Sequence, residues 1–197
     1  RIPAEGPGEN EVVLKDASGR WLYFQEPVEV LIASQLDQVI PVIEQASRAV
    51  EERDRHAAGF VAYEAAPAMD PALATHNSLQ PSSPNDPFVP LPLAWFAIYA
   101  SPMVVELPKS PSWEEMFSWH LHLSPRDYAE RIDRIKAYIA AGDTYQVNFT
   151  THVCTGILEP WAFFLDRFAP LANPFSAFIA TPSHTICSAS PELFFEL

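Results

Sequence analysis

The chain has 197 residues, of which 48% are hydrophobic and 19% are charged, a composition typical of a globular protein with a substantial core. Its formal net charge of -13 at pH 7 argues against nucleic acid and anionic membrane surfaces as partners, because both are bound through clustered Lys and Arg. The sequence has no apolar run near the roughly 20 residues of a membrane span and no recognisable signal peptide, so we expect no membrane partner and a cytoplasmic protein.

The first half of the chain predicts a hairpin, a helix and three further strands. Residues 11–15 and 20–25 resemble two strands around the turn-rich quartet at 16–19. An amphipathic helix follows, with apolar side chains at helical spacing. These are Leu36, Ile40, Ile43, Ala46 and Val50. Residues 60–63 predict a buried strand, residues 65–92 a long surface loop, and residues 93–100 and 103–107 two more strands.

The clearest helix of the second half begins at Ser124, an N-cap followed by proline, and ends at Gly142. Its apolar stripe consists of Tyr128, Ile132, Ile135 and Ile139. Residues 160–168 predict a second helix, and residues 174–180 and 185–190 predict two strands.

Residues 142–150, GDTYQVNFT, alternate between polar and apolar side chains, which is the pattern of a strand that follows the helix directly. We expect Gln146 and Asn148 to point into the interior of a larger enzyme as a structural polar strand, where buried amides must be hydrogen-bonded.

The residues alone leave several chemical roles open. His120 and His122 share a strand face and either bind a metal or lie on a solvated surface, and no third ligand is placed beside them. The carboxylates of Glu64 and Asp70 could do acid-base work or serve as capping and loop residues, and Asp143 is either catalytic or a turn residue. The two cysteines, Cys154 and Cys187, lie in strand-like runs, where we expect buried, reduced thiols.

Four ordered motifs resemble the aminodeoxychorismate synthase component I family, a branch of the chorismate-utilising enzymes. They are GFVAYEAAPAMD at 59–70, PLAWF at 92–96, GDTYQVN at 142–148 and SASPELF at 188–194. The related anthranilate synthase component I family usually has Gln-Val-Val where this chain has residues 146–148, so Asn148 favours the aminodeoxychorismate branch.

The resemblance implies a transferase that uses ammonia to replace the 4-hydroxyl group of chorismate, giving 4-amino-4-deoxychorismate for para-aminobenzoate and folate biosynthesis. It also implies a glutamine amidotransferase, as a subunit or a fused domain, and Mg²⁺ as a Lewis acid in the full-length enzyme. In the family the catalytic lysine and the metal-binding glutamates lie beyond the SPEXF motif, and the three lysines of this chain match none of these positions. We therefore assign no catalytic, substrate-binding or metal-binding residue, and expect no cofactor to bind this chain alone.

The resemblance further implies a tryptophan pocket, for which Ser34, Pro174, Phe175 and Ser176 are the candidates. Residues 31–34 correspond to the family's L-L-E-S element, but Ala33 stands where the family has glutamate. This difference argues against tryptophan binding. Ser34 is alternatively a helix N-cap, and Phe175 is alternatively a core residue.

The predicted fold class is α+β, with layered antiparallel sheets and flanking helices, as in the amino-terminal part of the anthranilate synthase component I-like fold. We expect an amino-terminal domain at 1–107, a linker and connecting strand at 108–123, and the start of a chorismate-binding domain at 124–197. Because the chain begins without Met and stops in an apolar run, we interpret it as a piece of a longer protein that is inactive alone. The alternatives are anthranilate synthase component I and a non-catalytic module that binds tryptophan or docks the amidotransferase.

Overall fold

The computed structural model describes residues 1–75, 89–110, 119–121, 123–151, 153–156, 159–171 and 173–193. Contacts divide the chain into two compact units, residues 1–113 with 159–197, and residues 114–158. The division predicted from sequence, at 107 and 124, stays a prediction, because contacts report compactness rather than inherited domain boundaries.

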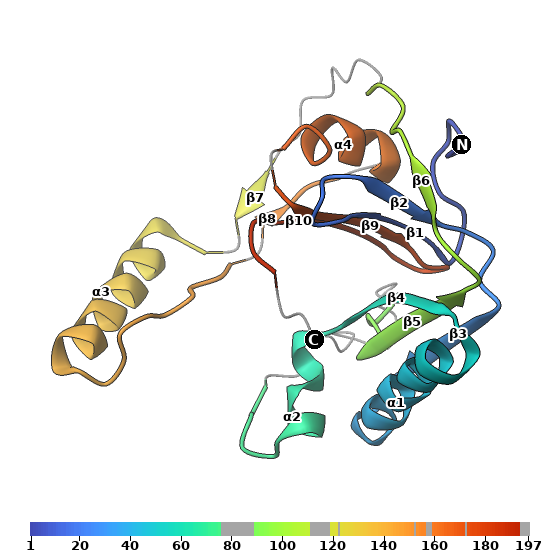
Figure 1. Cartoon of the computed structure of the whole chain (residues 1–197). Coiled ribbons are helices and arrows are strands. Elements are labelled where there is room, and N and C mark those ends of the chain that lie inside the picture. The colour runs from blue at the N-terminus through green and yellow to red at the C-terminus, as the bar shows by residue number, and fades with distance from the viewer. Residues whose placement is uncertain are drawn as a thin grey trace. The chain divides into compact units, whose positions relative to one another are not determined.

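Two antiparallel sheets form the first unit (Figure 1). The larger sheet has the order β10-β9-β1-β2-β6, and the smaller sheet has the order β3-β5-β4. The strands of the larger sheet are β1 (Glu11–Lys15), β2 (Trp21–Phe24), β6 (Met103–Val105), β9 (Phe175–Ala180) and β10 (Thr185–Ser190). Those of the smaller sheet are β3 (Glu29–Ala33), β4 (His56–Val61) and β5 (Ala94–Tyr99).

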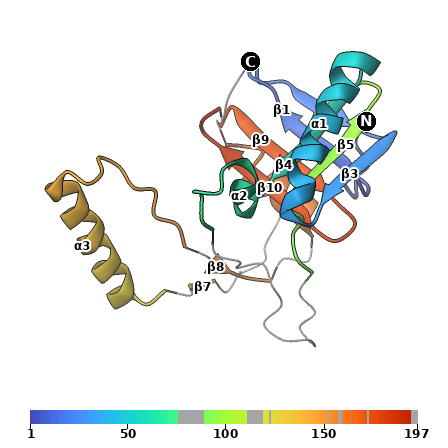
Figure 2. The same cartoon turned by 90° about the horizontal axis from the view of Figure 1, so that it is seen from below.

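Helices cover the outer faces of both sheets. Helix α4 (Pro160–Arg167) packs against the larger sheet, and α1 (Leu36–Arg53) packs against the smaller one. The view from below shows α1 running alongside the strands of the smaller sheet (Figure 2). A 3-10 turn, η1 (Tyr63–Ala65), and the short helix α2 (Ala66–Met69) follow β4. Apolar side chains fill all three spaces between these layers. The predicted α+β class, with antiparallel sheets and flanking helices, is confirmed.

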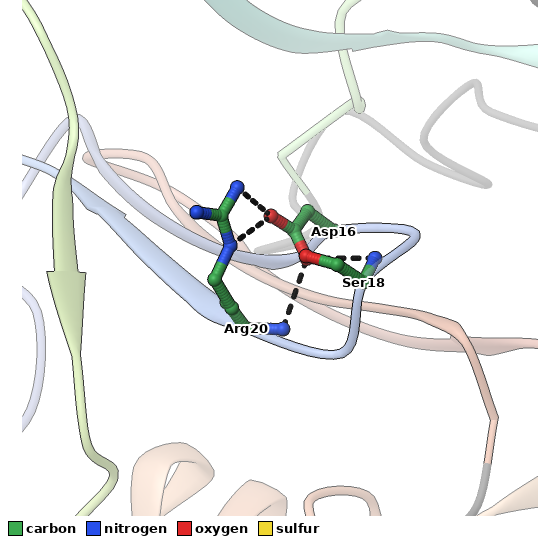
Figure 3. A network of polar contacts seen from close by, with 3 residues as sticks. All are labelled: Asp16, Ser18 and Arg20. Carbon is green, nitrogen blue, oxygen red and sulfur yellow. Dashed lines mark hydrogen bonds and ion pairs between the residues drawn. The ribbon is translucent and has the colours of Figure 1, made fainter.

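The predicted hairpin forms between β1 and β2, and one carboxylate organises its turn (Figure 3). Asp16 Oδ1 accepts hydrogen bonds from the backbone N–H groups of Ser18 and Arg20, at 3.0 and 2.9 Å, and from the Ser18 hydroxyl at 2.7 Å. Its other oxygen accepts from Arg20 Nε at 2.9 Å. Gly19 supplies the positive φ of 83° that closes the turn.

Helix α1 lies where the sequence predicts it, but of the apolar residues named from the sequence only Ala46 is buried, and Ile43 is partly buried. The buried positions are Val39, Val42, Ala46 and Ala49, whereas Leu36, Ile40 and Val50 are exposed. The helix carries two neighbouring apolar stripes, and helical spacing fits both. The stripe with two alanines faces the sheet, where small side chains let the backbones approach.

The predicted strand 60–63 is shifted in the structure. Strand β4 begins at His56, and Tyr63 lies in η1 with 80% of its surface exposed. Strand β3 (Glu29–Ala33) is not among the strands predicted from the sequence.

The second unit contains α3 (Pro125–Ala141) and the short pair β7 (His120–Leu121) and β8 (Val153–Cys154). The predicted caps of α3 are confirmed: Ser124 Oγ accepts a hydrogen bond from the Asp127 N–H, and Gly142 has a φ of 82°. The predicted strand at 142–150 is wrong, because residues 142–150 are irregular and pair with no strand in the described part of the chain.

Candidate functional site

The motif at residues 59–70 builds an apolar pocket of about 800 Å³ in the first unit. It is lined by residues of β4, of the turn that follows β4 and of α2, together with Ile43 of α1 and Phe96 of β5. The lining residues of this motif are Gly59, Phe60, Val61, Ala62, Tyr63, Ala66 and Met69. Such a pocket can hold an apolar group, and its volume lies within the range of small-molecule sites.

Gly59 is required by the close approach of β4 to β5. A Cβ atom at this position would lie 2.0 Å from the carbonyl oxygen of Trp95 and 2.8 Å from the Cα atom of Phe96. The indole ring of Trp95 stacks on Phe60, with 6.2 Å between ring centroids. A glycine within a strand pattern is a sequence signal for such an approach, although sequence reasoning did not identify this pocket.

Carboxylates near this motif have local roles in the structure. Asp70 Oδ1 accepts a hydrogen bond from the Ala72 N–H at 2.9 Å, and the Asp70 N–H donates to the Ala66 carbonyl group at the end of α2. These contacts are those of a capping and loop residue, one of the two roles considered for Asp70. Glu64 is half-buried in η1.

Ser34 lies directly after β3, at the end of the smaller sheet, and is exposed. The N-cap of α1 is Gln35, so the alternative role of Ser34 as the N-cap is wrong. Instead, the backbone N–H groups of Ser34 and Gln35 both donate to Gln38 Oε1, at 2.9 and 3.1 Å.

The other three tryptophan-pocket candidates lie at the start of β9, in the larger sheet. Pro174 and Phe175 are half-buried, whereas Ser176 is 1% exposed and its hydroxyl has no hydrogen-bond partner among the described residues. Successive strand residues face opposite sides, so Phe175 and Ser176 lie on different faces of the sheet. Ser176 shares its face with Phe178, which packs against α4. The tryptophan pocket stays a prediction.

Gln146 and Asn148 belong to the second unit and are exposed in this chain. Gln146 Nε2 donates a hydrogen bond to Asn148 Oδ1 at 3.4 Å. Tyr145, which precedes Gln146 in the sequence, is 91% exposed. The role predicted for both amides concerns the interior of a larger enzyme and stays a prediction.

The remaining candidates are Asp143, His120 and His122. Asp143 is exposed and its N–H donates to the Tyr138 carbonyl group, a turn contact at the end of α3. His120 is exposed in β7, whereas His122 lies outside the described residues. Within the ranges that the structure describes, no three His, Cys, Asp or Glu side chains are grouped so as to hold a metal ion.

The cysteines differ from each other. Cys154 is exposed, so the prediction of a buried thiol is wrong there, because β8 lies in a two-stranded ribbon. Cys187 is half-buried, and burial raises the pKa of its thiol to about 12, so it stays protonated at neutral pH.

The chain was compared with known families and proteins. Residues 9–197 match the family described as chorismate binding enzyme. A 106-residue segment is 30% identical to aminodeoxychorismate synthase component 1 of Klebsiella aerogenes, covering 53% of this chain and 22% of that protein. The protein of the same name from Escherichia coli K12 is 32% identical over 77 residues, 39% of this chain and 17% of the relative.

A protein of the same name from a third organism also matches. Aminodeoxychorismate synthase component 1 of Bacillus subtilis 168 is 30% identical over 67 residues, which are 34% of this chain and 14% of that protein. The matched segments thus span between 14% and 22% of the length of these relatives. None of the described helices is long and apolar enough to cross a membrane.

Proposed function

The chain belongs to the chorismate-binding enzyme family, and we propose on that basis that it is part of an enzyme that aminates chorismate to 4-amino-4-deoxychorismate. The observation that carries the proposal is the family match over residues 9–197, together with relatives that are named aminodeoxychorismate synthase component 1. Asn148 supports this branch over anthranilate synthase component I, in which valine is usual at that position.

We place the chemical step on residues outside these 197. The family's catalytic lysine lies in a Pro-Ile-Lys-Gly-Thr type of motif, and the sequence of this chain contains no such motif. The two sheets would then provide a rigid support for a chorismate site that further polypeptide completes. Ammonia would come from a glutamine amidotransferase, as a subunit or a fused domain, and the setting would be cytoplasmic.

Mg²⁺ belongs to the proposal for the complete enzyme only. The described residues offer no group of three or more His, Cys, Asp or Glu side chains for a metal ion. The residues that can be assigned are supporting ones. Gly59 lets β4 and β5 approach, and the aromatic pair Phe60 and Trp95 fills the space between the sheets.

The test uses the complete gene product that contains residues 1–197, with chorismate, Mg²⁺ and ammonium ions, followed by chromatography and mass spectrometry. We expect 4-amino-4-deoxychorismate without release of pyruvate. Anthranilate together with pyruvate would overturn the proposal in favour of anthranilate synthase component I. Unchanged chorismate from a folded protein would instead favour a non-catalytic module, and tryptophan titration by calorimetry would then test that role.

The 197-residue chain provides a second measurement. Once shown to be folded, it should give no product under the same conditions. Product from this chain alone would contradict the placement of the chemistry on residues outside it.

A further inference from the structure

Lys15 ends β1 in a row of side chains that crosses three strands. The register pairs Lys15 with Trp21 on β2. On its other side, β1 pairs with β9 through Leu14 and Ala177, so the next position places Lys15 beside Ser176. This row lies on the face of the sheet that packs against α4.

The ammonium group of Lys15 contacts the connection between α4 and β9. Nζ donates to the Asn173 carbonyl oxygen at 3.1 Å and lies 3.5 Å from the Leu171 carbonyl oxygen. It also lies 5.6 Å from the centroid of the Trp21 ring, a distance at which an aromatic face attracts a cation. Lys15 and Asn173 are 158 positions apart in sequence, so this contact joins the two ends of the first unit's chain.

The same connection is also held from the other side. Asn173 Nδ2 donates to the carbonyl oxygen of Ala189 on β10 at 2.8 Å. Asn173 is thus bound to β1 through its carbonyl group and to β10 through its side chain. Pro174 follows and has no N–H group to donate, and pairing of β9 with β10 begins only at Phe175, opposite Ser190.

We propose that Lys15 is the positioning residue for residues 174–176, the segment in which Phe175 and Ser176 take opposite faces of the sheet. Lys15 fixes this segment by binding the two carbonyl groups that precede it. The structural part of the inference depends only on these contacts. Its consequence for a ligand rests on the tryptophan pocket that the family resemblance implies, to which this segment would contribute.

Hydrogen exchange of backbone amides tests the positioning role directly. In Lys15→Met, which keeps the length of the side chain but removes its donors, we expect the amides of Asn173 and of residues 175–177 to exchange at least about 10-fold faster, with β2 and α1 unchanged. Lys15→Arg keeps a cation and should restore exchange to within about 3-fold of the original chain. Lys136→Met, an exposed lysine on α3, is the matched control and should change nothing in this region.

Two results would overturn the proposal: unchanged exchange in folded Lys15→Met, or an equal acceleration across all strands of the larger sheet. The second result would mean that Lys15 supports only global stability. If Lys15→Met does not fold, Lys15→Gln is measured in its place, with the same expectation.

Calorimetric titration with tryptophan separates this inference from the proposed pocket. If tryptophan binds the original chain and its affinity falls at least about 10-fold in Lys15→Met, the result supports both the pocket and the positioning role of Lys15. No binding to the original chain, together with faster exchange in Lys15→Met, removes the pocket and leaves the positioning role in place. Binding that is equal in both proteins overturns the link between Lys15 and the ligand.

Discussion

The hydroxyl group of Tyr99, on the smaller sheet, donates a hydrogen bond to the backbone carbonyl oxygen of Asn10, which precedes the first strand of the larger sheet, at 2.7 Å. Tyr99 is fully buried, and its ring lies 5.3 Å from that of Phe24 on β2. The two sheets are therefore joined both by apolar packing and by a directional polar contact at the same residue.

Tyr99→Phe should lower the free energy of unfolding by about 1 kcal/mol, because it removes this hydrogen bond and keeps the ring. For a unit of this size the melting temperature should fall by about 2–4 °C. Denaturant unfolding measures the change. Tyr63→Phe is the control, since Tyr63 is exposed and should shift stability little. Equal effects in the two variants would show that the Tyr99 hydroxyl contributes nothing specific.

Local signals in the sequence predicted much of the fold. Ser124 and Gly142 determine the bounds of α3 because capping depends on neighbouring residues only. The hairpin of β1 and β2 was predictable for the same reason, since Asp16 organises its own turn. In α1 the helix could be predicted but its buried face could not, because the face is chosen by the partner sheet.

Features that depend on distant partners were not predictable. Residues 142–150 have the alternation of a strand, but a strand also needs a neighbour to bind its backbone groups, and the described residues supply none. The pocket beside Gly59 requires knowledge that β4 lies against β5 and α1. Likewise, nothing in the sequence around Lys15 indicates its contact with Asn173.

Gly59→Ala should destabilise the first unit by about 1–3 kcal/mol or more, since the new methyl group meets the Trp95 carbonyl oxygen, which cannot move without shifting β5. The free energy of unfolding by denaturant is the measurement. Gly156→Ala is the matched control, because a Cβ atom there meets nothing within 4 Å, and its effect should be within about 0.5 kcal/mol. A Gly59→Ala protein as stable as the control would show that β4 and β5 are not so close.

The Asp16 carboxylate should take up a proton only at a lower pH than an ordinary aspartate does. The Ser18 hydroxyl, followed by the hydrogen bonds and charge of Arg20, lowers the pKa of Asp16 from 3.8 to about 2. A lowered folded pKa contributes stability that is present above pH 3.8 and is lost as the pH falls through about 2. NMR titration of the side-chain carboxyl carbon measures this value directly.

Ser18→Ala tests the cause of this shift. It removes the largest contribution, so the pKa of Asp16 should rise toward 3.8, while Ser47→Ala, a control on α1, should leave it unchanged. An Asp16 pKa that stays near 2 in Ser18→Ala would assign the shift to Arg20 instead.

Tyr23 and Tyr99 should lose their hydroxyl protons only at unusually high pH. Burial raises the pKa of Tyr23 and of Tyr99 above the ordinary 10.0, and the Glu11 carboxylate adds to both shifts, accepting the hydrogen bond of the Tyr23 hydroxyl. The unfolded chain ionises these groups near pH 10, so their contribution to stability is complete below pH 10 and is lost as the pH rises above it.

Tyrosinate absorbance should therefore show two late groups, Tyr23 and Tyr99, whose ionisation lies above pH 10 in the folded chain. In Tyr23→Phe a single late group should remain, because Tyr99 keeps its buried position. Ionisation of Tyr23 and Tyr99 near pH 10, while circular dichroism still reports a folded chain, would contradict the burial of the two hydroxyl groups.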